Sequence, residues 1–295
     1  MATIEPPDAS RIRVDSLPGF GDDNSIDVNM LRLDRMHPFI SGNKWFKLCY
    51  NIEDAIRSGK QSILSFGGAY SNHLIALAAA AYARGLSSIG LVRGEEAVHN
   101  SVLAQCQAYG MQLHYLSRAH YAAKEDAGFL AELEQHFPEA LIVPEGGANE
   151  AGERGAAEIA GYIDRPFSHV ALSVGTGTSF IGLRRALPDV QQLLGFAPMK
   201  GGAYLAGTIK AKLQGLPENN WQVYDRFHFG GFGKISAEVS TFMARFYEQY
   251  GVELDRVYTA KMMLGIRQLI NEGAFPEGAQ ILCIHTGGLT GNDVT

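Results

Sequence analysis

Short apolar runs alternate with helical patterns along most of the chain. Apolar runs without polar alternation are typical of strands buried on both faces of a sheet. Such runs predict strands at residues 62–66, 88–92, 112–116, 140–143, 170–174 and 280–285. Helical periodicity predicts helices over residues 72–84, 101–109, 122–136, 151–163, 237–250 and 260–271. This β-α-β order predicts an α/β protein built from mostly parallel sheets flanked by helices.

The chain shows no obvious point of division. No linker rich in proline or serine interrupts its 295 residues, and no internal repeat is visible. We therefore expect two α/β lobes that share a continuous interface, with a ligand in the cleft between them. The smaller lobe is expected over residues 46–156, inserted in a larger lobe formed by residues 1–45 and 157–295.

Composition and charge exclude several classes of protein. A hydrophobic content of 46% is enough for one or two packed cores. The net charge is -6 and no block of Lys or Arg is present, so we expect no binding to nucleic acid. The longest apolar stretch, residues 74–83, is shorter than the roughly 18–20 residues of a membrane helix, and residues 1–5 lack the pattern of an export signal. We expect a soluble, cytoplasmic protein that binds no membrane.

Two sets of side chains that could carry chemistry are expected to serve packing instead. The cysteines are odd in number and form no CxxC pair, so they predict neither a disulfide framework nor a metal site. They are Cys49, Cys106 and Cys283, and we expect all three thiols to be buried. Met262, Ile266 and Leu269 recur at helical spacing and are expected in the core.

Glycine-rich turns follow several predicted strands, at residues 65–73, 145–149, 173–179 and 285–291. Glycine allows a positive φ and a close approach of the backbone, and a turn such as Gly175 to Ser179 that opens a helix forms a nest for a phosphate. None of these turns has the GxGxxG spacing of a dinucleotide site or the lysine of a Walker loop. The pattern therefore argues against a nucleotide-dependent Rossmann enzyme.

Lys44 stands between Gly42-Asn43 and Trp45-Phe46. Desolvation there would lower the pKa of its ammonium and leave a neutral amine that can bond to a carbonyl carbon. The alternative is a surface lysine whose stem covers Trp45. The lysine alone leaves both interpretations open.

Six motifs together carry a resemblance that covers nearly the whole chain, from about Asn43 to Gly288. They are Gly42-Asn43-Lys44, Ser71-Asn72-His73, Pro144–Asn149, Gly175-Thr176-Gly177-Thr178, Val257-Tyr258-Thr259-Ala260-Lys261 and Ile284–Gly288. In this order the chain resembles the fold-type-II pyridoxal-phosphate enzymes of the 1-aminocyclopropane-1-carboxylate deaminase/D-cysteine desulfhydrase family. The resemblance implies a two-lobe fold, pyridoxal 5'-phosphate as cofactor, a small amino acid as substrate, a homodimer and no metal.

The resemblance also implies roles for individual residues around the cofactor. Lys44 would bond to it covalently, and Asn72 would bind its phenolic oxygen. Thr259 and Thr286 would lie beside its pyridine nitrogen. The phosphate would be held by Gly175, Thr176, Gly177 and Thr178.

On the substrate side the resemblance leaves more alternatives. Ser71 and nearby amides would receive the substrate carboxylate, although Ser71 could be only a helix N-cap. His73 could be a base, but packing beneath the cofactor is favoured. Tyr258 could contact the substrate or bond a backbone carbonyl. Phe232 stands where the family usually has a tyrosine, which removes a phenol from the site.

Two positions bear on the reaction. Deaminases of this family resemble one another in a glutamate and a leucine where this chain has Thr259 and Thr286, whereas the desulfhydrases have Ser or Thr at both. We therefore expect β-elimination, with D-cysteine giving pyruvate, sulfide and ammonia and with Lys44, Ser71 and Tyr258 as catalytic residues. The alternatives are deamination of 1-aminocyclopropane-1-carboxylate, elimination from another amino acid such as D-serine, and a non-catalytic pyridoxal-phosphate-binding protein.

Overall fold

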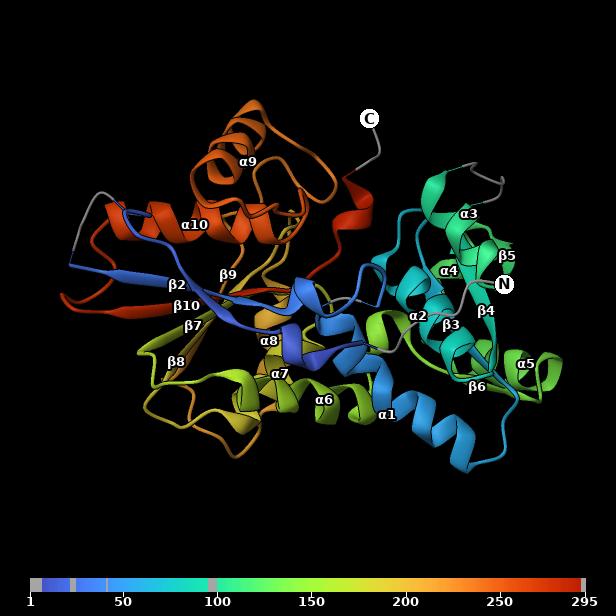
Figure 1. The fold of residues 1–295 in the computed structure, drawn as a ribbon. Coiled ribbons are helices and arrows are strands. Elements are labelled where there is room, and N and C mark those ends of the chain that lie inside the picture. The colour runs from blue at the N-terminus through green and yellow to red at the C-terminus, as the bar shows by residue number, and fades with distance from the viewer. Residues whose placement is uncertain (1–6, 22–24, 41, 95–99, 293–295) are drawn as a thin grey trace.

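The chain forms two β-sheets with helices packed against them (Figure 1). The computed structural model describes residues 7–21, 25–40, 42–94 and 100–292. The strands are β1 (Val14–Ser16), β2 (Asp27–Arg32), β3 (Ser62–Gly67), β4 (Ser87–Arg93), β5 (Gln112–Leu116), β6 (Ala140–Ile142), β7 (His169–Ser173), β8 (Gln192–Phe196), β9 (Trp221–Tyr224) and β10 (Gln280–His285). The larger sheet has the order β1-β2-β10-β7-β8-β9, and the smaller has β5-β4-β3-β6. Among these strands only β1 and β2 pair antiparallel, which confirms the predicted α/β class with mostly parallel sheets.

Helices connect the strands and cover the sheets. They are α1 (Asn43–Arg57), α2 (Asn72–Ala83), α3 (Ser101–Ala108), α4 (Arg118–Ala122), α5 (Ala127–His136), α6 (Glu150–Ala157), α7 (Thr178–Ala186), α8 (Tyr204–Lys212), α9 (Ala237–Tyr250) and α10 (Thr259–Asn271). Short 3-10 helices are η1 (Ala9–Arg11), η2 (Leu33–Met36), η3 (Glu145–Gly147), η4 (Glu158–Tyr162) and η5 (Leu289–Gly291). Figure 1 shows α9 and α10 over one face of the larger sheet and α7 and α8 over the other.

Helix α10 packs its apolar stripe onto the larger sheet. Met262, Ile266 and Leu269 are buried in one cluster with Ile281 of β10, which confirms the prediction that this stripe is core. Strands β7, β8 and β10 of this sheet are buried on both faces, as is typical of continuous apolar runs. The sheet therefore forms a rigid base for the turns that leave its carboxyl edge.

Helix α2 is the central helix of the smaller sheet. Every side chain from His73 to Ala81 is buried, against the sheet and against α1 and α3. A helix that is apolar on all sides is buried on all sides. Its N-terminus therefore lies at the carboxyl end of β3, and the motif Ser71-Asn72-His73 is held there by the core.

Two predicted helices differ from the observed ones. The helix predicted over residues 122–136 begins only at Ala127, as α5, and Ala122 is the last residue of α4. Asp126 separates them because its Oδ1 accepts hydrogen bonds from the N–H groups of Gly128 (3.0 Å) and Phe129 (3.1 Å) and so caps α5. The helix predicted over 151–163 is α-helical only to Ala157 and continues as the 3-10 helix η4.

The thiol prediction holds for two of the three cysteines. Cys106 and Cys283 are buried, but Cys49 is only partly buried, so the prediction is wrong for this residue. Cys49 lies on α1 at the contact with α6, and its Sγ donates a hydrogen bond to the carbonyl oxygen of Phe46 at 3.2 Å. Among the described residues, no helix is long and apolar enough to cross a membrane.

The lobe boundaries at residues 46 and 156 stay a prediction. The smaller sheet uses strands between residues 62 and 142, and the larger sheet uses strands before and after this range. Both boundaries fall inside helices, α1 and α6, which pack against each other beneath the two sheets (Figure 1). Residues 1–5, on which the prediction of no export signal rests, lie outside the described residues.

Candidate active site

Chain segments that are far apart in sequence meet at the carboxyl ends of the strands, where ligands bind in open α/β sheets. The N–H of Asn43 donates to the carbonyl oxygen of Thr286 at 3.3 Å, and the Asn43 side chain donates to Ser179 Oγ at 3.0 Å. The Thr290 hydroxyl donates to Asn72 Oδ1 at 2.8 Å. These contacts connect the starts of α1, α2 and α7 with the turn after β10, so the predicted motifs surround one place.

Lys44 lies in the first turn of α1. Its Nζ is 2.6 Å from Asn43 Oδ1 and 5.9 Å from the centre of the Tyr258 ring. Enclosure by protein lowers the pKa of the Lys44 ammonium to about 8, and the negative charge of Asp255 opposes this shift only in part. Roughly a tenth of Lys44 is therefore a neutral, nucleophilic amine at pH 7, far more than for a lysine with an ordinary pKa.

The start of α2 presents hydrogen-bond donors to the site. Ser71 is the N-cap, and its Oγ accepts from the N–H of Leu74 at 3.2 Å, which leaves its own O–H able to donate. Within the described residues, no hydrogen bond involves the N–H groups of Asn72 and His73. Free N–H groups at a helix N-terminus suit an anion such as a carboxylate.

The His73 ring is buried between α2 and β3. Its Nε2 lies 2.9 Å from Ser65 Oγ, and its Nδ1 has no partner among the described residues. Burial, and after it the charges of Lys47 and Lys44, holds the pKa of His73 well below its ordinary value. The imidazole is therefore neutral, a state that suits packing within the site, while a catalytic role for His73 stays untested.

The turn between β7 and α7 has the geometry of an anion nest. Gly177 has a left-handed φ of 87° and starts α7, and Thr176 Oγ1 and Thr178 Oγ1 lie 2.8 Å apart. In the described part of the chain, no N–H from Gly175 to Thr178 donates a hydrogen bond. These donors and the positive end of the helix dipole converge on one point.

Lys47 places a buried amine beside this nest, and the sequence does not predict it. The side chain is 6% exposed and forms no ion pair in the described residues. A Cβ built on Gly146 would lie 2.9 Å from Thr176 Cγ2 and 3.7 Å from Lys47 Nζ, so the ammonium lies close to the nest. Burial, and then the charge of Lys44, holds the pKa of Lys47 well below its ordinary value. A bound anion would restore the charged form.

Asp255 builds the other wall of the site. Its Oδ1 accepts from the N–H groups of Val257 (3.1 Å) and Tyr258 (2.7 Å), and its Oδ2 accepts from Thr259 (2.7 Å). This cap fixes the start of α10 and the direction of Tyr258, whose pKa is raised by burial and by the Asp255 charge. Thr259 is fully buried, yet its Oγ1 has no partner among the described residues.

Phe232 and Thr286 complete the predicted set. Phe232 is 53% exposed and meets the Tyr258 ring edge to face, with ring centres 5.9 Å apart. Thr286 is buried in the turn after β10, where its carbonyl oxygen accepts from Asn43. Every predicted site residue therefore lies on a segment that borders Lys44 or one of its neighbours.

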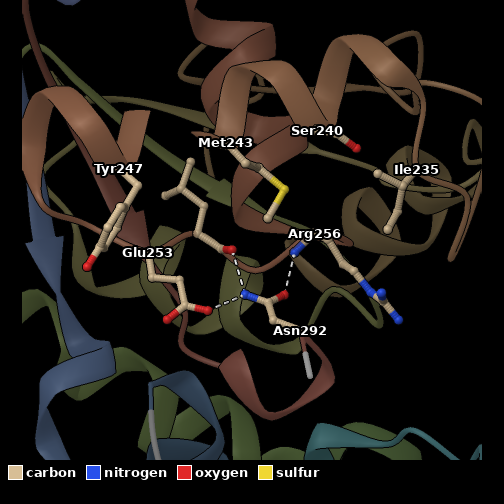
Figure 2. Close-up of a pocket in the computed structure, with 8 residues that line it drawn as sticks. Ile235, Ser240, Met243, Tyr247, Glu253, Arg256 and Asn292 are labelled. Atoms are coloured by element: carbon tan, nitrogen blue, oxygen red, sulfur yellow. Dashed lines mark hydrogen bonds between the residues drawn. The ribbon is translucent and has the colours of Figure 1, made fainter. Parts of the chain in front are cut away.

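A separate pocket of about 270 Å³ lies beneath α9 (Figure 2). Its lining consists of Ile235, Ser240, Met243, Tyr247, Glu253, Leu254, Arg256 and Asn292. The Asn292 amide closes one end, because it donates to Glu253 Oε1 (2.8 Å) and the Leu254 carbonyl (2.9 Å) and accepts from the N–H of Arg256. No predicted site residue lines this pocket, so we assign it no part in the site.

The sequence of the chain matches a known protein family. Residues 14–287 match the family model "Pyridoxal-phosphate dependent enzyme". The chain belongs to this family. The expected cofactor, pyridoxal phosphate, and the expectation of an enzyme are therefore confirmed.

Curated relatives and solved structures agree with this membership in pyridoxal-phosphate dependent enzymes. The chain is 29% identical to a putative 1-aminocyclopropane-1-carboxylate deaminase of Pyrococcus horikoshii, over 93% of this chain and 88% of that protein. It is 24% identical to D-cysteine desulfhydrase of Klebsiella pneumoniae, over 92% and 90%. A crystal structure described as an ACC deaminase homologue superposes with a TM-score of 0.82 at 26% identity, covering 99% of this chain and 92% of that one. O-ureido-L-serine synthase, at 15% identity and a TM-score of 0.71, shares the fold.

The residues present fit pyridoxal phosphate. The buried, unpartnered Oγ1 of Thr259 is a hydrogen-bonding group that suits a ring nitrogen. The unpaired N–H groups of Gly175 to Thr178, together with Lys47, match the charge and the acceptors of a phosphate. Lys44 would supply the amine, and the Asn72 amide can donate to an oxyanion.

Three contributors to the site do not stand out in the sequence. Lys47 follows Lys44 by three residues, so both project from one face of α1, and this spacing could have revealed it. Asp255 stands next to the Val257–Lys261 motif, but nothing local shows that its carboxylate caps α10. The bond from Thr290 to Asn72 joins residues 218 positions apart and has no sequence pattern.

Proposed function

We propose that the chain catalyses β-elimination and deamination of a small amino acid, with D-cysteine as the best substrate. The balanced reaction converts D-cysteine and water into pyruvate, hydrogen sulfide and ammonia. The observation that carries the proposal is the placement of the Lys44 amine, 5.9 Å from the centre of the Tyr258 ring and close enough to His73 of α2 for its charge to act there. The bound cofactor supplies an electron sink for the electron pair left at the substrate Cα.

The chain's own residues would bind the substrate and move its protons. The N–H groups of Asn72 and His73 and the hydroxyl of Ser71 receive the carboxylate at the start of α2. The neutral Lys44 amine would remove the Cα proton of the bound amino acid. Tyr258, held by Asp255, covers the opposite side with a phenol that burial keeps protonated and able to donate.

Thr259 and Thr286 support elimination over ring opening. A hydroxyl at the pyridine nitrogen does not favour protonation of the ring as a carboxylate would, so the electron sink is weaker. A weaker sink is adequate where a good leaving group departs directly from Cβ, as sulfide does. Among relatives, both a putative 1-aminocyclopropane-1-carboxylate deaminase and D-cysteine desulfhydrases match this chain, so the substrate has to be measured.

The test is the absorption spectrum of the purified protein before and after addition of D-cysteine, with sulfide and pyruvate assayed in the same sample. A visible band that shifts as both products appear supports the proposal. A band that shifts without sulfide release would reject D-cysteine and direct the assay to D-serine and 1-aminocyclopropane-1-carboxylate. A band that no amino acid shifts would favour the non-catalytic alternative.

Exchange of Thr259 and Thr286 tests whether these two residues favour β-elimination over ring opening. We expect Thr259→Glu with Thr286→Leu to lower sulfide release from D-cysteine by at least about tenfold, or about 1.4 kcal/mol of transition-state stabilisation. Ammonia release from 1-aminocyclopropane-1-carboxylate should rise in the same variant. The matched control is Thr208→Glu, an exposed threonine on α8. Unchanged selectivity in the double variant would show that these positions do not decide the reaction.

The pKa of Lys44 predicts how fast the protein takes up its cofactor. Because the amine must be neutral to react, the rate at which cofactor-free protein combines with pyridoxal phosphate should rise about tenfold per pH unit below pH 8. Above about pH 8 the rate should level off. Rapid-mixing absorbance measures it, and pyridoxal without the phosphate serves as control because it removes the phosphate titration. A rate that continues to rise towards pH 10.5 would contradict the lowered pKa.

A further inference from the structure

A glycine-rich turn carries Phe232 to the mouth of the site, and its backbone is unusual. Phe229, Gly230, Gly231 and Gly233 all have positive φ, of 45°, 102°, 109° and 68°. Such a conformation is costly for a residue with a side chain and persists only where the surroundings hold it. The turn's own hydrogen bonds are few, with Gly231 donating to the His228 carbonyl at 3.1 Å and accepting from the N–H of Lys234 at 3.1 Å.

The strongest contact on this turn comes from Lys261. Its Nζ donates to the carbonyl oxygen of Gly231 at 2.7 Å and more weakly to that of Pro198 at 3.4 Å. The side chain is 1% exposed, and in the described residues it forms no ion pair. A buried ammonium that meets only carbonyl oxygens must keep these bonds, because losing them would leave the charge unsolvated.

One helix connects both aromatic residues at the mouth. Lys261 lies on α10 three residues after Tyr258, whose backbone is fixed by Asp255. The Asp255 charge also opposes the desolvation that lowers the pKa of Lys261. The start of α10 thus holds Tyr258 directly and holds the turn of Phe232 through Lys261, which accounts for the edge-to-face contact of the two rings.

We propose that Lys261 is a positioning residue that holds the turn of residues 229–233 against Tyr258 and so determines how tightly the substrate side chain is enclosed. The inference rests on the proposed function, because it takes Phe232 and Tyr258 to face the substrate. Lys261 itself contacts neither substrate nor cofactor. Its effect should therefore appear in amino-acid binding and be transmitted through Phe232.

The experiment is a double-mutant cycle on the cofactor-loaded protein. We measure the Kd of D-cysteine, D-serine and 1-aminocyclopropane-1-carboxylate from the shift of the visible band, which requires binding but no turnover. Lys261→Met should weaken binding between roughly tenfold and a hundredfold, the range for a hydrogen bond to a charged group. Phe232→Ala should weaken binding similarly. The double variant should bind amino acids no more weakly than the weaker-binding of the two single variants.

Controls separate positioning from a general loss of structure. The band of the bound cofactor and the affinity for pyridoxal phosphate should stay unchanged in Lys261→Met. Lys210 is an exposed helical lysine paired with Glu218. Lys210→Met should leave the cofactor band, the affinity for pyridoxal phosphate and the Kd of the amino acids unchanged. If Lys261→Met does not fold, Lys261→Gln, which keeps a neutral donor, replaces it and should show a smaller loss in the same cycle.

The possible outcomes distinguish a failure of this inference from a failure of the proposed function. Effects of Lys261 and Phe232 that multiply in the double variant, or a Lys261 variant that binds amino acids normally, would overturn the positioning role. Binding of an amino acid without release of sulfide would overturn only the proposed reaction. A Lys261 variant that loses cofactor affinity as much as substrate affinity would also reject the inference, because it would place Lys261 in the cofactor site.

Discussion

Replacing Lys44 by alanine is expected to abolish the visible band of the lysine-bound cofactor and to remove turnover. In the proposed function the side chain provides both the covalent bond to the cofactor and the base at Cα, and loss of the base alone costs roughly 10²–10⁴-fold in rate. Little destabilisation is expected, because the Lys44 amine makes one hydrogen bond, to Asn43. The measurements are the absorption spectrum and the release of pyruvate.

Two further variants make this expectation specific. Lys44→Arg keeps the positive charge, but its guanidinium stays protonated and cannot bond to the cofactor, so it should be as inactive as alanine. Lys60→Ala removes a partly exposed lysine beyond the end of the same helix, whose Nζ donates to the Pro138 carbonyl at 2.7 Å, and should leave spectrum and turnover unchanged. A small free amine such as methylamine should restore part of the activity of Lys44→Ala. Full activity of Lys44→Ala would overturn the central assignment.

The parts of the fold that could be predicted from sequence are those whose hydrophobic pattern is simple. Strands β3 and β10 are apolar runs and were predicted to within one residue. Strand β2 was not predicted, because Asn29 and Arg32 lie in it and are nevertheless buried. Arg32 is tolerated there since Asp34 and Asp15 pair with its guanidinium, at 2.7 and 2.9 Å, a compensation that only the folded chain provides.

In the candidate site, too, some features could be predicted from the sequence and others could not. Short segments that supply one chemical group, such as the lysine of α1 and the glycine-rich turn before α7, are recognisable in the sequence. Contacts that assemble them are not, because they join distant positions. Thr290 is an example: its hydroxyl holds the Oδ1 side of Asn72 and leaves the NH₂ group of Asn72 able to donate to an oxyanion.

Gly42 shows how closely assembly and chemistry are coupled, and Gly42→Ala is expected to have the largest effect on stability. The residue starts α1 with φ +63° and ψ −147°, a conformation that is nearly confined to glycine. A Cβ there would lie 1.9 Å from the carbonyl oxygen of Thr286, which is backbone and cannot move aside alone. Strain and overpacking together should lower the free energy of unfolding by about 2–6 kcal/mol.

The matched control is Gly59→Ala. Gly59 follows the end of the same helix with a similar φ of +72°, but a Cβ there would meet nothing within 4 Å. It should lose only about 1–2 kcal/mol, the intrinsic cost of a left-handed residue. Urea unfolding of the cofactor-free proteins measures both variants, since a bound ligand would add stability of its own. Equal destabilisation would show that the contact with Thr286 is not tight.

The same substitution should also separate Lys44 from the turn after β10. If α1 and this turn move apart to admit the methyl group, the bond from the N–H of Asn43 to Thr286 is lost, and Lys44 shifts away from Thr286. Gly42→Ala should therefore bind pyridoxal phosphate more weakly than Gly59→Ala even at temperatures where both are fully folded. A Gly42→Ala protein that is destabilised yet binds the cofactor normally would show that the close approach serves only packing, and that the lysine is positioned by α1 itself.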